Sequence, residues 1–279
     1  METRPQLQLR GQNNDSTHFV NIRYDGDTID ISNNTSALGS SATILGFGAR
    51  GGTAPQSDTT AVGQTALATG DMATAYGYHA QATRAESTAV GHDSKATAAN
   101  STSVGRDSQA FGDNATAIGH GTRADSSGTA LGNAANASET AVAIGNSANA
   151  TAESSIAIGD NSRAIGVSTA IGASSNADGY TSSAFGYKTK TTGANAVAIG
   201  TTFGATNCTA GTNSVAVGAG AWADKLTNSN TAVANAVAIG FRANAGDNGV
   251  AIGGPEGTGT YQNTRTGANA VALGSGTNA

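Results

Sequence analysis

The chain has 279 residues, of which 39 are glycine, 12% are charged and 5% are aromatic, and its formal net charge is -5. Average proteins carry roughly 7% glycine and about 25% charged residues. So few charges exclude a chain kept disordered by self-repulsion, and the negative balance excludes a basic surface for nucleic acid. The single cysteine, Cys208, excludes an intrachain disulfide. We therefore expect a regular fold built from small side chains.

The first ten residues include Glu2, Arg4 and Arg10 and lack the apolar run of a secretion signal. No stretch of the sequence approaches the roughly 18 apolar residues that a membrane helix needs. We expect a protein that is made in the cytoplasm and does not insert into a membrane.

Residues 1–35 do not repeat, and they contain three short runs in which apolar and polar residues alternate. The runs at 6–10 and 19–24 are followed by a turn signal and by a third run at 28–31. They predict a small N-terminal β module that caps the fold or docks it to a larger structure. The candidate docking residues are Leu7, Leu9, Phe19, Ile22 and Tyr24.

From residue 36 to residue 279 one tripeptide recurs, made of a small residue, then a larger apolar residue, then glycine. Between Gly63 and Gly200 these glycines lie 13 or 14 residues apart. In one full copy, Val142 and Ile144 alternate with alanines before Gly145, and a second alternating segment follows at 148–150. The period of two predicts two short strands in each repeat, joined by tight turns.

A unit of two short strands cannot bury its apolar face alone, so we expect the copies to stack into a parallel solenoid. With coils about 4.8 Å apart, the stack would be a rod on the order of 75 Å long. We predict that the branched side chains form the core and that alanines on the opposite face meet other chains. The predicted core residues are Val142, Ile144, Ile156, Ile158, Val197 and Ile199. The predicted interface residues are Ala143, Ala157 and Ala198.

The period is broken in four places, which predicts inserted loops at about residues 40–62, 201–217, 219–239 and 254–273. Two interpretations stay open. The loops cover an end of the roll or pack between chains, or they bind a surface through residue types that are favoured at hot spots. The candidate surface-binding residues are Phe203, Trp222, Lys225, Tyr261 and Arg265.

The sequence contains no known catalytic motif: it has no nucleophile elbow, no zinc-protease motif and no phosphate-binding loop. Its four histidines are separated by whole repeats, with no carboxylate at the usual ligand spacing. Aspartates such as Asp93 and Asp107 fall in predicted turns, where turn formation explains them. We therefore expect no catalytic residue, no metal and no cofactor. A polysaccharide-cleaving alternative would need two carboxylates in a groove.

Residues 195–200 (NAVAIG) and 213–218 (NSVAVG) resemble the head repeats of trimeric autotransporter adhesins, the YadA-like head family. The resemblance covers roughly residues 36–279. It implies a left-handed parallel β-roll solenoid of about 14-residue repeats, in which three chains form an intertwined homotrimer that binds host surfaces.

An adhesin of that family also has a secretion signal, a coiled-coil stalk and an anchor, and the sequence shows none of these segments. Bacteriophages use similar repeats in fibres, spikes and capsid decorations, which need no signal. We therefore expect a virion structural protein that residues 1–35 dock to a capsid or tail protein, with a host cell-surface glycan or protein as a further partner. It would be made in the host cytoplasm and displayed on the virion surface. The alternative is the head fragment of a bacterial trimeric adhesin on the outer surface of the cell.

Overall fold

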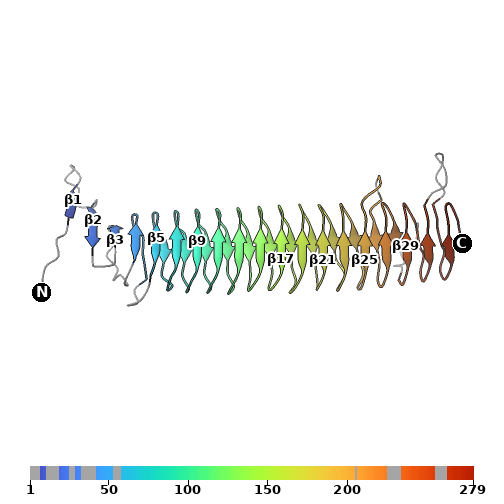
Figure 1. Ribbon diagram of the computed structural model, residues 1–279, viewed down its shortest axis with the longest axis horizontal. Coiled ribbons are helices and arrows are strands. Elements are labelled where there is room, and N and C mark those ends of the chain that lie inside the picture. The colour runs from blue at the N-terminus through green and yellow to red at the C-terminus, as the bar shows by residue number, and fades with distance from the viewer. Residues whose placement is uncertain are drawn as a thin grey trace. The chain divides into compact units, whose positions relative to one another are not determined.

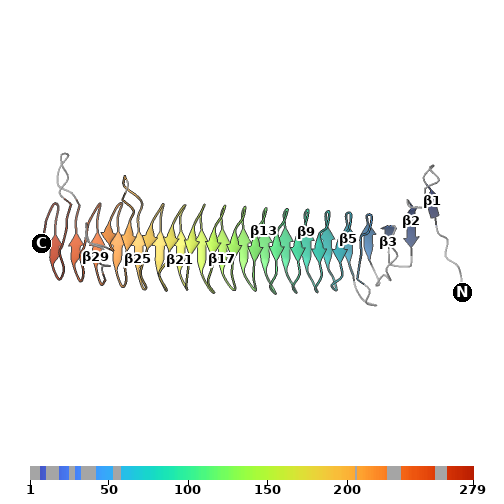
Figure 2. The same ribbon diagram turned by 180° about the vertical axis from the view of Figure 1, so that it is seen from behind.

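The computed structural model describes residues 7–10, 19–24, 29–32, 42–52, 58–204, 206–224, 234–254 and 263–279. The chain forms two units, residues 1–135 and residues 136–279. Every regular element in the described residues is a β-strand, and within each unit most strands stack coil upon coil (Figure 1). The same stacking is visible from behind (Figure 2). The predicted all-β parallel solenoid is confirmed. In the described residues no helix exists that is long and apolar enough to cross a membrane.

The first unit opens with three strands that pair differently from the rest. Strands β1 (Leu7–Arg10), β2 (Phe19–Tyr24) and β3 (Ile29–Ser32) form an antiparallel sheet, as the alternating runs predict. Strand β3 then pairs in parallel with β4 (Thr43–Leu45), which belongs to the repeats. The five candidate docking residues lie in β1 and β2.

The repeats of the first unit form two parallel ladders. Sheet A contains the three-residue strands β4, β5 (Thr60–Val62), β7 (Thr74–Tyr76), β9 (Thr88–Val90), β11 (Thr102–Val104), β13 (Thr116–Ile118) and β15 (Thr129–Leu131). Sheet B contains the two-residue strands β6 (Leu67–Ala68), β8 (Gln81–Ala82), β10 (Lys95–Ala96), β12 (Gln109–Ala110) and β14 (Arg123–Ala124). Each strand pairs with the strand one coil away, so equivalent positions stand in columns.

The second unit repeats this arrangement. Its sheet A contains β17 (Val142–Ile144), β19 (Ile156–Ile158), β21 (Thr169–Ile171), β23 (Ser183–Phe185), β25 (Val197–Ile199), β27 (Val215–Val217), β29 (Val237–Ile239), β30 (Val250–Ile252) and β31 (Val271–Leu273). Its sheet B contains β16 (Asn136–Ala137), β18 (Asn149–Ala150), β20 (Arg163–Ala164), β22 (Asn176–Ala177), β24 (Lys190–Thr191), β26 (Thr209–Ala210) and β28 (Trp222–Ala223). Single bridges continue sheet B through Asn244, Arg265 and Asn278.

Most of the described coils are closed by two tight turns, and each of these turns holds a left-handed residue. In the coil that begins with β7, His79 has φ 54° and Glu86 has φ 56°. This conformation costs a non-glycine residue roughly 1 kcal/mol. Hydrogen bonds between coils offset the cost, because the His79 amide donates to the carbonyl of Gln64 at 3.0 Å and the Glu86 amide donates to that of Asp71 at 2.8 Å.

The core between the two sheets is made of small side chains. In the coil of β7, Ala75, Ala80, Ala82 and Ser87 are all 0% exposed. Their equivalents in other coils are mostly alanine, serine or threonine, and they form buried columns through each unit. The two sheets can approach this closely only because these side chains are small.

The predicted assignment of the two strand faces is wrong. Ala143, Ala157 and Ala198 are 0% exposed within one chain and point into its core, so they cannot form an interface between chains. The residues predicted to fill that core point outward instead and are half-buried or exposed. These residues are Val142, Ile144, Ile156, Ile158, Val197 and Ile199. The alternation separates two faces but does not say which is inside. In these coils the alanine face fills the gap between the two sheets.

The intervals predicted as loops contain further repeat structure. The interval 40–62 includes β4, whose Ile44 is 2% exposed and fills the core position that alanine takes elsewhere. The intervals 201–217, 219–239 and 254–273 include strands of sheets A and B. Of the extra residues, those at 201–207 are described except for residue 205, and they form an inserted turn.

Candidate functional site: the outer face of sheet A and its flanking turns

The first and third residues of each sheet A strand point away from the core and form the outer face of each unit. In the second unit these residues are mostly Val and Ile, and Val142, Ile156 and Thr169 stand in one column through the registers of β17, β19 and β21. Exposure varies along the face: Ile144 and Val217 are half-buried, whereas Ile199 is 43% exposed and Leu273, in the last coil, is 62% exposed. The solenoid therefore leaves a continuous apolar stripe uncovered.

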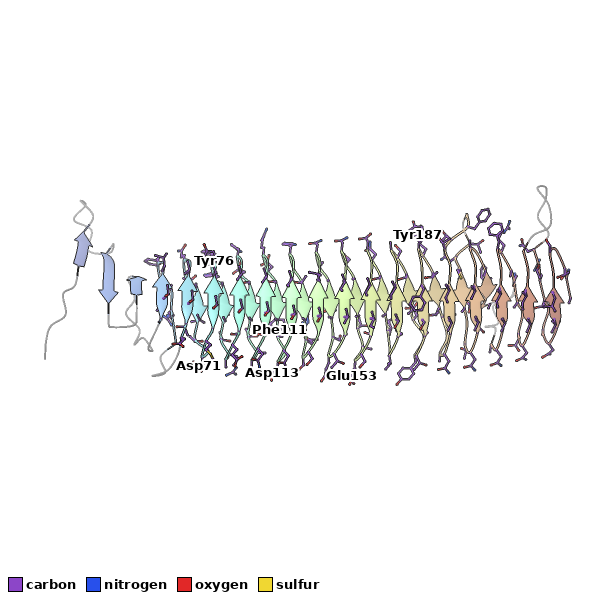
Figure 3. All side chains as sticks on the ribbon, in the orientation of Figure 1. Asp71, Tyr76, Phe111, Asp113, Glu153 and Tyr187 are labelled. Atoms are coloured by element: carbon purple, nitrogen blue, oxygen red, sulfur yellow. The ribbon has the colours of Figure 1, made fainter. Side chains whose placement is uncertain are left out.

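In the first unit the outer face of sheet A has two unlike columns. The first position of every repeat strand is threonine, from Thr43 to Thr129. The third position is apolar, and it includes Leu45 at 45% and Tyr76 at 56% exposure. Tyr76 lies near the edge of the unit opposite Asp71 and Asp113 (Figure 3). Apolar patches of this kind on a soluble protein usually mark an interface.

An asparagine ladder runs along the second turn of five coils in the second unit. Each side-chain amide donates to the carboxamide oxygen of the next asparagine at 2.9 to 3.2 Å. Each backbone is left-handed, with φ between 51° and 57°, a conformation that asparagine tolerates better than most residues. The members are Asn195, Asn213, Asn235, Asn248 and Asn269. We did not predict this ladder from the sequence, although an asparagine begins each of these NAVAIG-like segments and signals it.

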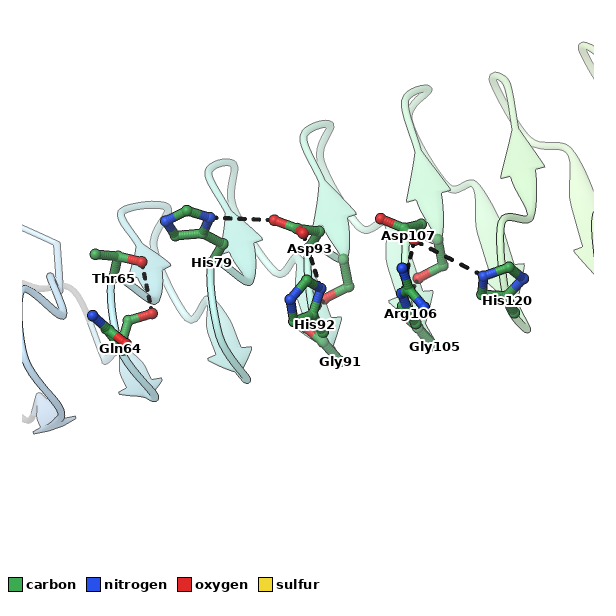
Figure 4. A network of polar contacts seen from close by, with 12 residues as sticks. Gln64, Thr65, His79, Gly91, His92, Asp93, Gly105, Arg106, Asp107 and His120 are labelled. Carbon is green, nitrogen blue, oxygen red and sulfur yellow. Dashed lines mark hydrogen bonds and ion pairs between the residues drawn. The ribbon is translucent and has the colours of Figure 1, made fainter.

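The first turn of the coils in the first unit carries a network of imidazoles and carboxylates (Figure 4). His79 Nδ1 lies 3.3 Å from Asp93 Oδ1, and His92 Nδ1 lies 2.9 Å from Asp93 Oδ2. One coil further, Asp107 Oδ2 contacts Arg106 Nε at 3.1 Å and His120 Nε2 at 3.9 Å. These groups come from successive coils and are 35% to 67% exposed.

The inserted turn at 201–207 presents an aromatic cluster. Phe203 is 44% exposed and packs edge-to-face on Phe241, with ring centroids 4.5 Å apart. The guanidinium of Arg242 lies 5.6 Å from the centroid of the Phe203 ring. Sequence reasoning selected Phe203 but missed Phe241 and Arg242, which follow Gly240 at a turn position where many coils have polar residues. We call these three residues the aromatic cluster.

The other candidate binding residues are distributed differently from the prediction. Trp222 and Arg265 lie in the outer column of sheet B, with Asn244 between them, and not in inserted loops. The indole of Trp222 is half-buried. Lys225 and Tyr261 lie outside the described residues.

Cys208 has no exposed surface and fills a core position at the end of the inserted turn. Burial raises the pKa of its thiol from 9.0 to about 11. The thiolate is the reactive form of cysteine, so this side chain is an inert part of the core.

Comparison with known protein families gives a match that follows the repeats. The YadA head domain repeat, a model of two copies, matches residues 54–80, 68–94, 82–108, 96–122, 139–162, 168–187, 177–202 and 210–225. Together these matches cover more than half of the chain. No curated protein matches the chain as a relative.

Proposed function

Because the chain belongs to the YadA head domain repeat family, we propose that it is an adhesive surface head that assembles as a homotrimer through the outer face of sheet A. The carrying observation is the apolar stripe of Val and Ile that one chain leaves uncovered. Family members of this kind are structural proteins, and the proposed role is binding and not catalysis.

The core of one roll is thin and consists largely of alanine, which supports the proposal that the chain gains stability from contact with other copies of itself. Alanine buries little apolar surface, and burial contributes about 25 cal/mol per Å². Covering a half-exposed Val or Ile would add about 1 kcal/mol for each side chain. A column of such residues, repeated through the second unit, would add considerably to the stability of a roll whose own interior is made of small side chains.

The aromatic cluster is the contact that we propose for adhesion. Phe203 is exposed, and Phe241 and Arg242 hold it in place. Exposed aromatic rings next to a guanidinium suit both sugar faces and acidic groups on a host surface.

Two measurements test this function. Light scattering should give three times the 27.2 kDa mass of one chain, whereas a monomer would contradict the proposal. Binding to host cells should fall in Phe203→Ala and persist in Tyr180→Ala, because Tyr180 is an exposed aromatic residue of the same unit outside the cluster. Equal binding by both variants would remove the aromatic cluster from the contact.

We further infer that the head belongs to a virion, as a fibre, spike or capsid decoration. The antiparallel pairing of β1, β2 and β3 supports a separate docking module, because the later strands of the described residues pair in parallel ladders. Deletion of residues 1–35 should keep the trimer but abolish incorporation into particles. Incorporation of the truncated trimer would contradict docking. Labelling of a bacterial outer surface, with no labelled particles, would favour the alternative of a bacterial adhesin head.

A further inference from the structure

Three of the four histidines of the chain stand in the first turns of one stretch of the first unit. They are His79, His92 and His120. The sequence argued against a metal site because whole repeats separate them. In a parallel solenoid, however, residues one repeat apart are neighbours, about 4.8 Å apart along the stack. The spacing that argued against a site in the sequence therefore brings these side chains close together in the fold.

Three potential ligands converge on this ridge. One ligand atom from each of His92, Asp93 and Asp107 lies within 4.8 Å of the other two. Ligand atoms around a single zinc ion lie roughly 3.4 Å apart, given bonds of about 2.1 Å. Small side-chain rotations would close the difference, because all three side chains are 35% to 50% exposed.

The backbone and a tyrosine ring fix the positions of the ligands. Asp93 and Asp107 are both left-handed, with φ 54° and 55°. Their amides donate to the carbonyls of Tyr78 and His92, each at 2.9 Å. The ring of Tyr78 stacks on His92, with centroids 5.0 Å apart and planes 21° from parallel. The site is therefore largely formed before any ion arrives.

We propose that His92, Asp93 and Asp107 bind one divalent transition-metal ion of the zinc class. Imidazole nitrogen with carboxylate oxygen is a typical zinc ligand set, whereas Mg²⁺ and Ca²⁺ prefer oxygen alone. Water would complete the coordination at this exposed position. His79 is a positioning residue, because its ring contacts Asp93 Oδ1 at 3.3 Å. Arg106 and His120 approach Oδ2 of Asp107, so the ion would use the other oxygen of that carboxylate.

The ion would connect two neighbouring coils, because Asp93 and Asp107 lie one repeat apart. An ion that binds only the folded chain stabilises it by mass action. It would also neutralise two carboxylates that stand one above the other. The site lies wholly in the first unit and does not depend on the proposed trimer or on adhesion.

Calorimetric titration of the full chain with Zn²⁺ alone tests the site. We expect one ion for each chain and binding at least about tenfold weaker in His92→Ala and in Asp93→Asn. Asp160→Asn is the matched control, because Asp160 occupies an equivalent first turn of the second unit beside Asn146 and without a histidine. It should bind Zn²⁺ as the wild type does.

Two outcomes would overturn the proposal. One is unchanged Zn²⁺ binding in His92→Ala and Asp93→Asn, and the other is equally tight binding of Ca²⁺ or Mg²⁺. Circular dichroism and light scattering of the same samples report whether the variants keep their fold and mass. If the variants do not fold, the wild type can be tested with Cu²⁺ as a paramagnetic probe of the same site. Its electron paramagnetic resonance spectrum should show coupling of the bound ion to imidazole nitrogen. A spectrum with oxygen ligands only would overturn the site.

Discussion

A Cβ added to Gly119 would lie 2.0 Å from the carbonyl oxygen of Gly132 in the next coil. Gly119 also has φ +134°, a conformation that L side chains rarely adopt. The repeated glycine therefore sets both the turn and the distance between coils. Gly121, two residues later, has φ +62° but nothing within 4 Å of its added Cβ.

Substitutions at Gly119 and Gly121 test how closely the coils are stacked. We expect Gly119→Ala to lower the free energy of unfolding by at least about 2 kcal/mol, because backbone strain and overlap add. Gly121→Ala should cost only about 1 kcal/mol, the usual cost of a left-handed alanine. Chemical denaturation followed by circular dichroism measures both. Equal effects would mean that the coils are not stacked as closely as Gly119 and Gly132 indicate.

The alanine core gives a second prediction. Ala157 is 0% exposed between Ala143 and Ala170 in the ladder, so Ala157→Leu should strain the roll and destabilise it by about 1–3 kcal/mol or more. The matched control is Ile158→Leu, which changes the shape of the adjacent outward residue and should cost less than about 1 kcal/mol. Denaturation midpoints distinguish them. A stable Ala157→Leu chain that is altered only in its oligomeric mass would restore alanine to the interface.

The strands and their stacking can be predicted from the sequence, but which face of each strand points into the core cannot. The alternation of Val142, Ala143 and Ile144 and the spacing of the glycines are enough to predict strands, coils and parallel stacking. The inward face could not be predicted from hydrophobicity, because the larger side chains ordinarily mark a core. Here the short turns bring the sheets close together, and the small Ala143 lies between them while Val142 and Ile144 point outward.

The candidate site was harder to predict for a related reason. Side chains from different coils become neighbours, so the contacts of His79 with Asp93 and of Phe203 with Phe241 depend on the exact register of each coil. Trp222 was assigned to a loop because the interval between glycines was too long. The extra residues in fact follow Trp222, which keeps its place in sheet B.

Cys208 gives a prediction for alkaline pH. Burial raises the pKa of its thiol to about 11 from 9.0, so the unfolded chain releases the proton at a lower pH than the folded chain does. The unfolded state therefore binds fewer protons above pH 9, and stability falls as the pH rises from about 9 to about 11, by on the order of 2 kcal/mol.

The control is Cys208→Ala, since alanine fills the same position in other coils. Denaturation curves of the wild type and of Cys208→Ala, measured at several pH values, should diverge in this window and run parallel below it. If both chains lose stability equally, the thiol is not the titrating group.

Charge placed on the outer face of sheet A tests the proposed trimer most directly. In Ile156→Asp combined with Ile158→Asp, two carboxylates would replace half-buried apolar side chains of β19. If three copies meet on this face, the change places unpaired charges in the interface, at a cost of several kcal/mol. We therefore expect the mass by light scattering to fall from that of the trimer to that of the single chain. The denaturation midpoint should also fall, because the outer face of sheet A would no longer be buried against other chains.

Asn149→Asp is the control, because Asn149 points outward from sheet B and its Oδ1 accepts a hydrogen bond from Asn136 that an aspartate can also accept. A double variant that keeps the mass of the wild type would place the interface elsewhere, whereas dissociation of both variants would show only that added charge weakens the assembly from any face.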